Sequence, residues 1–204
     1  LKMTEIKFSR FDVINFLIKN YNYKKYLEIG VQYAVAWNNV ICDYKIGVEP
    51  IHDHADPRIN KLYSNEFFNI NKETFDIIFI DGDHNYAQVI NDIRNAKMVL
   101  NPGGSIVLHD CRPLTEEFAT NPLLNGTVWR AVCEIVSEPG WNICTLNDDH
   151  GVGVLREGKM QPLPINPHMS YQEFEKNRVE ILNLKDEEPF KKFFTDSETY
   201  RLIS

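Results

Sequence analysis

One stretch in the middle of the chain constrains the fold most: Phe75-Asp76-Ile77-Ile78-Phe79-Ile80-Asp81-Gly82-Asp83-His84-Asn85-Tyr86. Its first part is a continuous apolar run that is too short for a buried helix and rich in Ile and Phe. Such a run is typical of a strand covered on both faces, as in a parallel sheet. Two carboxylates and an imidazole then follow, at Asp81, Asp83 and His84. Open α/β sheets bind their ligands at this end of the strands, so we expect the functional site here.

A helix and a second polar-tipped strand are predicted to follow this stretch. The apolar residues have close to the spacing of one buried helix face, at Tyr86, Val89, Ile90, Ile93 and Met98. The segment Asn101-Pro102-Gly103-Gly104 is expected to end the helix. The next apolar strand begins at Ser105 and ends in His109-Asp110. Because βαβ crossovers are right-handed, the tips of the two strands should be neighbours at one edge of the sheet.

The first part of the chain predicts two more strand ends of this kind. An amphipathic helix over residues 8–20, capped by Ser9, precedes a strand that ends in Glu28-Ile29-Gly30. The next strand ends at Glu49, about twenty residues after that glycine, where nucleoside-binding α/β folds hold a ribose diol with a carboxylate. A solvated Glu before a turn proline is the simpler alternative. A short third strand is expected within residues 59–68, with Ser64 and Asn65 at its polar tip.

The second half of the chain predicts a loop, a helix, a hairpin and an extension. Residues 111–126 form a long loop beside the site, and residues 127–136 return to a helical pattern. Two strand-like runs, over 141–146 and 151–155, predict an antiparallel hairpin. We place a domain over residues 1–160 and a helical extension over 161–204. The extension carries aromatic residues that need a partner surface, either the domain or a second subunit in a homo-oligomer: Phe190, Phe193, Phe194 and Tyr200.

Composition bounds the class of protein. At 204 residues, with 43% hydrophobic and 25% charged residues, the chain is expected to fold as one globular domain. A net charge of -7 without a basic cluster argues against binding to nucleic acid, since that affinity comes mostly from neutralising phosphates. Neither a leader segment nor a membrane span is evident, so we predict a cytoplasmic protein with no membrane partner. The four cysteines lie far apart and suggest neither a zinc knuckle nor a disulfide framework.

The ordered combination of these motifs resembles the class I S-adenosylmethionine-dependent methyltransferases, over roughly residues 24–156. The branch of macrocin-type sugar O-methyltransferases is the most similar. The resemblance implies a Rossmann-like α/β three-layer sandwich with a mostly parallel seven-stranded sheet and an antiparallel terminal hairpin. It also implies that Glu28 and Gly30 line the methionine part of S-adenosylmethionine, that Glu49 holds the ribose, and that Ser64 and Asn65 lie near the adenine.

Two departures from the family pattern bear on the site. The first loop of the family usually carries further glycines, where this chain has Gln32 and Ala34. In metal-dependent relatives, the residue matching Asp81 and an acidic or amide pair after the next strand hold a divalent ion. Here that pair is Asp110-Cys111, and a thiol is a poor ligand for Mg²⁺, which prefers oxygen. Asp81 and Asp110 are therefore the candidate ligands for a divalent cation such as Mg²⁺.

The sequence favours an O-methyltransferase acting on a small hydroxylated acceptor, such as a sugar. Asp83 or His84 is the candidate base for the hydroxyl proton. A purely structural alternative gives both residues a capping role at the following helix. Two competing functions stay open: a nucleotide-dependent oxidoreductase, although the first turn lacks G-x-G-x-x-G, and a non-catalytic scaffold that keeps the fold.

Overall fold

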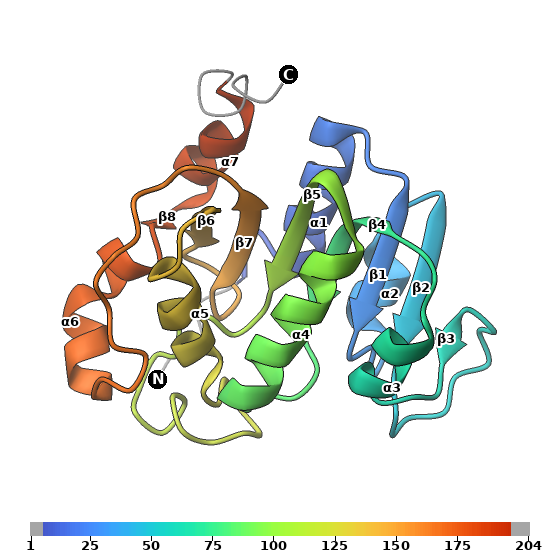
Figure 1. Ribbon diagram of the computed structural model, residues 1–204, viewed down its shortest axis with the longest axis horizontal. Helices are drawn as coiled ribbons and strands as arrows, with labels where there is room; N and C mark the ends of the chain where they lie inside the picture. The colour runs from blue at the N-terminus through green and yellow to red at the C-terminus, as the bar shows by residue number, and fades with distance from the viewer. Residues whose placement is uncertain (1–5, 197–204) are drawn as a thin grey trace.

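A single β-sheet forms the frame of the molecule. The computed structural model describes residues 6–196, which include the strands β1 (Lys25–Ile29), β2 (Tyr44–Val48), β3 (Ile59–Asn60), β4 (Phe75–Ile80), β5 (Leu100–Leu108), β6 (Trp141–Leu146), β7 (Val152–Glu157) and β8 (Leu184–Lys185). Their order in the sheet is β3-β2-β1-β4-β5-β7-β6-β8 (Figure 1). The strands from β3 to β5 pair in parallel, whereas β7 runs antiparallel to both β5 and β6.

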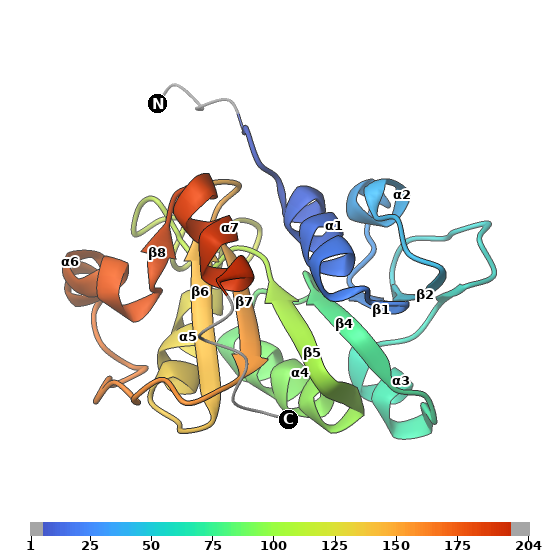
Figure 2. The same ribbon diagram turned by 90° about the horizontal axis from the view of Figure 1, so that it is seen from above.

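Helices cover both faces of the sheet. They are α1 (Arg10–Tyr21), α2 (Val35–Asn39), α3 (Ser64–Ile70), α4 (Tyr86–Val99), α5 (Val128–Val136), α6 (Tyr171–Ile181) and α7 (Glu187–Thr195). Seen from above, α1, α2 and α7 lie on one side of the sheet, and α3, α4 and α5 lie on the other (Figure 2). Each side has its own buried core, because the central strands place apolar side chains on both faces.

This architecture confirms the predicted fold class, a Rossmann-like α/β sandwich with a mostly parallel sheet and an antiparallel hairpin. The described residues contain eight strands rather than the predicted seven, because the short strand β8 pairs in parallel with the outer edge of the hairpin, at β6. The extra strand comes from the extension, so this segment shares the sheet with the rest of the chain.

Three local predictions were wrong. Met98 is 75% exposed, because it lies on the opposite side of α4 from the buried residues Val89 and Ala96. The strand β5 begins at Leu100 rather than Ser105, so Asn101-Pro102-Gly103-Gly104 ends the helix but already belongs to the strand. Ser64 and Asn65 do not lie at the tip of β3; they form the first turn of α3, four residues beyond the strand.

The extension packs on the first helix as well as on the sheet. Phe190 and Phe194 of α7 are buried and belong to the same core cluster as Val13 and Leu17 of α1. The backbone carbonyl of Phe194 also accepts hydrogen bonds from the side chains of Asn20 and Tyr21. The predicted domain boundary at residue 160 stays a prediction, and Tyr200 lies outside the described residues.

Candidate active site

Four parallel strands, β1, β2, β4 and β5, end at the same edge of the sheet, and polar residues lie at these ends. The parallel register aligns Ile29 with Val48, Ile29 with Ile80, and Ile80 with Leu108. The residues that follow these aligned ends are Gly30, Glu49, Asp81 and His109. Regular backbone pairing alone therefore brings together groups that lie up to about eighty residues apart in the sequence.

A cavity of about 370 Å³ opens at this edge. Its lining includes most of the predicted cofactor residues, namely Gly30, Glu49, Ser64 and Asn65, together with Asp81 and Asp83. A smaller cavity of about 30 Å³ adjoins it, lined by Glu28 and Arg10 among others, and the two cavities share Gly30, Gln32 and Asp81. The fold thus places the predicted cofactor residues around two cavities that share part of their lining.

The turn after β1 depends on a glycine. Gly30 has a φ of 87°, and a Cβ atom at this position would overlap with the backbone carbonyl of Asp81. Only glycine tolerates both conditions without strain. Gln32 and Ala34 also have positive φ angles, of 47° and 60°. The loop therefore keeps a backbone conformation that suits glycine even where the chain carries larger residues.

The carboxylate of Glu49 is buried and held by backbone N–H groups. Its Oε2 accepts from Gln32 at 2.8 Å, and its Oε1 accepts from Ile51 and His52 at 2.8 and 3.0 Å. Burial would raise the pKa of Glu49, but these hydrogen bonds outweigh it and leave the pKa below its usual range. Glu49 is thus a fixed anion at the wall of the cavity, and the simpler reading of a solvated side chain is wrong.

Glu28 has the opposite character. It is buried on β1 and accepts a hydrogen bond of 2.6 Å from the hydroxyl of Tyr26. Burial raises the pKa of Glu28 to about 8, so its carboxyl group is largely protonated at neutral pH. The two acidic residues at this edge therefore offer different chemistry: Glu49 is an anion, and Glu28 is a neutral group able to donate.

A polar cluster lines the far side of the larger cavity. The Nε2 atom of Gln88 donates to Ser64 Oγ, Asn65 Oδ1 and Asp92 Oδ1 at 3.1, 3.2 and 2.9 Å. The Asp92 side chain comes from α4 and its residue is only 1% exposed. Burial raises the pKa of Asp92 to about 6. Gln88 and Asp92 were not predicted from the sequence, because they lie within the amphipathic pattern of a helix and belong to no motif.

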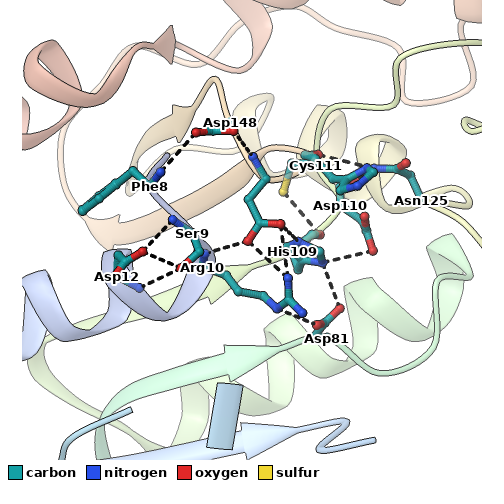
Figure 3. A network of polar contacts seen from close by, with 12 residues as sticks. Phe8, Ser9, Arg10, Asp12, Asp81, His109, Asp110, Cys111, Asn125 and Asp148 are labelled. Carbon is teal, nitrogen blue, oxygen red and sulfur yellow. Dashed lines mark hydrogen bonds and ion pairs between the residues drawn. The ribbon is translucent and has the colours of Figure 1, made fainter. Parts of the chain in front are cut away.

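The imidazole of His109 lies between the acidic tips of β4 and β5. Its Nδ1 is 3.3 Å from Asp81 Oδ1 and 3.2 Å from Asp110 Oδ2, and its Nε2 is 3.3 Å from Asp149 Oδ1 (Figure 3). Burial would lower the pKa of His109, but the surrounding carboxylates raise it well above its usual value. Burial would likewise raise the pKa of Asp81, and His109 reverses this and holds it below the usual range. The ring is therefore an imidazolium that joins three carboxylates.

A second cation reaches the same carboxylates from the first helix. Arg10 Nη1 lies 3.2 Å from both oxygens of Asp149, and Arg10 Nε lies 3.7 Å from Asp81 Oδ2. The backbone N–H of Arg10 also donates to Asp149 Oδ2 at 2.7 Å. The neighbouring Asp148 accepts from the backbone N–H groups of Lys7 and Phe8. The turn between β6 and β7 thus fixes the start of α1 over the site.

The predicted base, His84, points toward the acidic pair. Its Nδ1 donates to the backbone carbonyl of Leu124, and its Nε2 lies 3.3 Å from Asp110 Oδ2 and 3.7 Å from Asp81 Oδ1. Burial would lower the pKa of His84, but Asp81 and Asp110 raise it. Because Nδ1 is occupied by the carbonyl, Nε2 is the atom that can exchange a proton or hold a ligand.

Asp83 has a different role from His84. It is exposed, and its Oδ1 accepts from the backbone N–H of Asn85 at 2.8 Å. The N-cap of α4 is Asn85 itself, whose side chain accepts from the N–H of Ala87 at 3.1 Å. The alternative in which Asp83 and His84 cap the helix is therefore wrong, although Asp83 does stabilise the turn that leads into it.

The residues that follow β4 and β5 provide some of the ligands that a divalent ion would need. One ligand atom from each of Asp81, His84 and Asp110 lies within 4.8 Å of the others. The thiol of Cys111 is buried and turns toward the carbonyls of Leu108 and His109, at 3.7 Å, so it offers nothing to such an ion. Two carboxylates and one imidazole suit a divalent cation whose remaining positions are taken by water.

Comparison with known proteins adds independent evidence. Residues 35–111 match the profile of a family described as a methyltransferase domain. The match covers this segment and less than half of the chain, and it confirms the predicted enzyme class of methyltransferase. No curated protein sequence matches the chain.

Solved structures share the fold at low sequence identity. A provisionally named O-methyltransferase from Klebsiella pneumoniae has a TM-score of 0.57 at 18% identity, over 77% of this chain and 83% of its own. An O-methyltransferase from Bacillus cereus, in complex with S-adenosylhomocysteine, has a TM-score of 0.55 at 18% identity, over 72% and 80%. The O-methyltransferase TomG from Streptomyces achromogenes, in complex with S-adenosylmethionine, has a TM-score of 0.55 at 12% identity, over 72% and 79%.

Proposed function

We propose that this protein transfers a methyl group from S-adenosylmethionine to a hydroxyl oxygen of a small acceptor. The observation that carries the proposal is the cavity of about 370 Å³ at the carboxyl ends of β1, β2 and β4, walled by Gly30 and Glu49. An α/β sheet binds nucleosides at this place, and a fixed carboxylate suits a ribose diol. The fold that the chain shares with structures holding S-adenosylmethionine or its product supports the same ligand.

The adenosyl part would lie in the larger cavity. Glu49 would accept hydrogen bonds from the ribose hydroxyls, since its oxygens are already oriented by three backbone N–H groups. Ser64 and Asn65, held by Gln88, would lie beside the adenine. The two cavities share Gly30, Gln32 and Asp81, so the sulfur-bearing chain would pass Gly30 on its way from one cavity to the other.

His84 is the proposed proton acceptor. When bound, S-adenosylmethionine supplies a methyl group on a sulfonium sulfur, which an attacking oxygen displaces in line. The acceptor hydroxyl would give its proton to His84 Nε2 as its oxygen forms the new bond to carbon. The Leu124 carbonyl keeps Nε2 directed at the site, and Asp81 and Asp110 stabilise the imidazolium that results. Asp83 is the weaker candidate, because its carboxylate is exposed and engaged with Asn85.

A divalent ion would be held by Asp81 and Asp110. It would supply a positive charge that stabilises the acceptor oxygen as it loses its proton. Since His84 Nε2 faces the same two carboxylates, the ion and the protonated ring would compete for one region. Chelation is therefore expected to alter the rate without abolishing cofactor binding.

The acceptor class is proposed as a small hydroxylated molecule, with sugars as the first compounds to screen. Within the described part of the chain, no helix is both long and apolar enough to cross a membrane. We retain a cytoplasmic location and a homo-oligomer as proposals.

Radiolabelled S-adenosylmethionine and a panel of hydroxylated metabolites would test the function. With an acceptor identified, His84→Ala should lower the methyl-transfer rate by about 100-fold or more while affinity for S-adenosylhomocysteine stays within about threefold. Asp83→Asn serves as the matched control at the same strand tip and should keep most of the rate. A fully active His84→Ala variant would refute the assignment of the base, and a wild-type protein that binds no adenosyl ligand would refute the function itself.

A further inference from the structure

The end of the loop over residues 111–126 holds both His84 and Asp110. The backbone carbonyl of Leu124 accepts from His84 Nδ1. The next residue, Asn125, donates from Nδ2 to the backbone carbonyl of Asp110 at 3.2 Å. The two groups held in this way face each other, with 3.3 Å between His84 Nε2 and Asp110 Oδ2. Two adjacent residues of the loop thus fix side chains that follow two different strands, β4 and β5.

The side chain of Asn125 is oriented by the groups around it. The residue is 1% exposed, and its Nδ2 also donates to the backbone carbonyl of His150 at 3.3 Å. A carbonyl oxygen only accepts, so the amide must direct its nitrogen at these two groups. Its own oxygen is buried and has no hydrogen-bond partner among residues 6–196. Burying an acceptor without a partner is costly, so the two bonds from the nitrogen are the reason for an amide at this position.

Asn125 restrains a peptide group at the site. Asp110 has a φ of 61°, a left-handed conformation that residues other than glycine rarely adopt. The peptide group that follows it is held at both ends. Its oxygen accepts from Asn125, which lies beside Asp110 and Cys111 in Figure 3, and its N–H, which belongs to Cys111, donates to the carbonyl of Gly151 at 3.0 Å. Because side-chain rotamers depend on the backbone, this restraint also directs the Asp110 carboxylate.

The same segment holds the backbone of His84. The carbonyl of His84 accepts from the N–H of Thr127 at 2.8 Å and from Thr127 Oγ1 at 3.3 Å. Gly126 has a φ of 56°, and a Cβ atom there would overlap with the His84 carbonyl. Residues 124–127 therefore hold both the ring and the backbone of His84, and Asn125 ties this segment to the end of β5.

We infer that Asn125 is a positioning residue for methyl transfer: it fixes the Asp110 carboxylate opposite His84 Nε2 and keeps the Leu124 carbonyl on Nδ1. The inference rests on the proposed function, in which His84 takes the proton of the acceptor. Asn125 exchanges no proton itself and acts through the groups that it holds. Loss of its hydrogen bonds leaves the ring less well oriented for proton transfer, so the defect belongs in kcat rather than in cofactor affinity.

Asn125→Leu removes the donor and keeps the approximate shape of the side chain. With an acceptor identified by the screen above, kcat should fall about ten- to hundredfold, while KM for the acceptor and Kd for S-adenosylhomocysteine change less than about threefold. In a His84→Ala background the same substitution should cost less than about threefold, because its effect passes through His84. Asn125→Ser, whose side chain is one atom too short, should give the same pattern.

Asn121→Ala is the matched control from the same loop. It removes the Oδ1 acceptor that holds the N–H of Leu123 at 2.9 Å, and it leaves the contacts to both strand ends in place. Its kcat should stay within about twofold of wild type. An Asn125→Leu variant with the wild-type kcat would overturn the inference. An equal loss of rate with and without His84 would also overturn it, since Asn125 would then act elsewhere.

A spectroscopic test needs neither acceptor nor cofactor. In NMR spectra of the full chain, the Nδ1–H proton of His84 should give a slowly exchanging resonance, correlated with its imidazole nitrogen, because it is bonded to the Leu124 carbonyl. The resonance should persist in Asn121→Ala and be lost by exchange with water in Asn125→Leu. Its absence from wild type, or its persistence in Asn125→Leu, would overturn the inference. A protein that shows the expected pattern but binds no S-adenosylhomocysteine would instead contradict the proposed function.

Discussion

Replacing Asp92 by Asn should stabilise the protein at neutral pH. Asp92 is almost completely buried, and burial raises its pKa from the ordinary 3.8 to about 6. At pH 7 the carboxyl group is ionised in both states but disfavoured in the folded one. A difference of about two pKa units corresponds to about 3 kcal/mol, which is an upper estimate for the gain in unfolding free energy. Asn keeps an oxygen that accepts from Gln88, so the local hydrogen bond survives.

The gain should depend on pH in a defined direction. Because the folded protein binds the Asp92 proton more tightly than the unfolded chain, stability is fully present below about pH 4 and falls as pH rises to about 6. The advantage of Asp92→Asn is therefore expected to shrink from about 3 kcal/mol at pH 7 to about half of that at pH 5. Urea unfolding of both proteins at the two pH values measures the difference.

Asp43→Asn provides the comparison for an exposed carboxylate. The side chain of Asp43 is 75% exposed and pairs with the exposed Lys24, so its replacement should change stability by less than about 0.5 kcal/mol. An Asp92→Asn variant that is no more stable than wild type at pH 7 would refute the reasoning. So would a gain that is the same at pH 5 and pH 7, since ionisation of Asp92 would then not be its cause.

Further predictions concern the turn, the ion and the extension. Gly30→Ala should cost about 2 kcal/mol or more in stability and abolish cofactor binding, as measured by urea unfolding and calorimetry, because φ is 87° and the Asp81 backbone leaves no room. Treatment with a chelator should lower the methyl-transfer rate but leave the affinity for S-adenosylhomocysteine unchanged; an unchanged rate would exclude the ion from the reaction. Phe190→Ala should lower the unfolding free energy by about 3 to 5 kcal/mol, since the ring is fully buried, and a value below 1 kcal/mol would contradict its place in the core. Light scattering of the full chain is expected to report a homo-oligomer, and a monomeric mass would end that expectation.

The central strands were predictable from local patterns because a strand that is buried on both faces is apolar at nearly every position. The run at Phe75–Ile80 is apolar at almost every position, and the change to Asp81 marks the end of β4. The strand ends at Gly30 and Glu49 were predictable for the same reason. Parallel pairing then makes them neighbours without further information from side chains.

The cationic part of the site could not be predicted in this way. Arg10 and Asp149 are 139 residues apart in the sequence, and neither lies in a recognisable motif. His109 was noted only as the polar end of a strand, and its contacts to three carboxylates depend on the packing of β4, β5 and the hairpin turn. Carboxylates that lie this close together need a compensating positive charge. Two side chains, Arg10 and His109, provide that charge.

Helix-borne residues were the other source of error. Asn65 and Asp92 reach the cavity from α3 and α4, where their polarity resembles that of any solvent-facing residue. Met98 was assigned to the buried face, but it comes nine residues after Val89, which places it on the opposite side of the helix. An apolar residue within a helix is therefore not evidence of burial unless its angular position also agrees.

Titration calorimetry with S-adenosylhomocysteine tests the central claim most directly. We expect one molecule to bind per chain, and Glu49→Ala to weaken binding by about 1 to 3 kcal/mol, because the ribose hydroxyls lose an acceptor whose oxygens are held in place by Gln32, Ile51 and His52. Glu180→Ala, at an exposed position on α6, should leave the affinity unchanged. No heat of binding to the wild-type protein, or the same affinity in Glu49→Ala as in wild type, would contradict the assignment of this cavity to the cofactor.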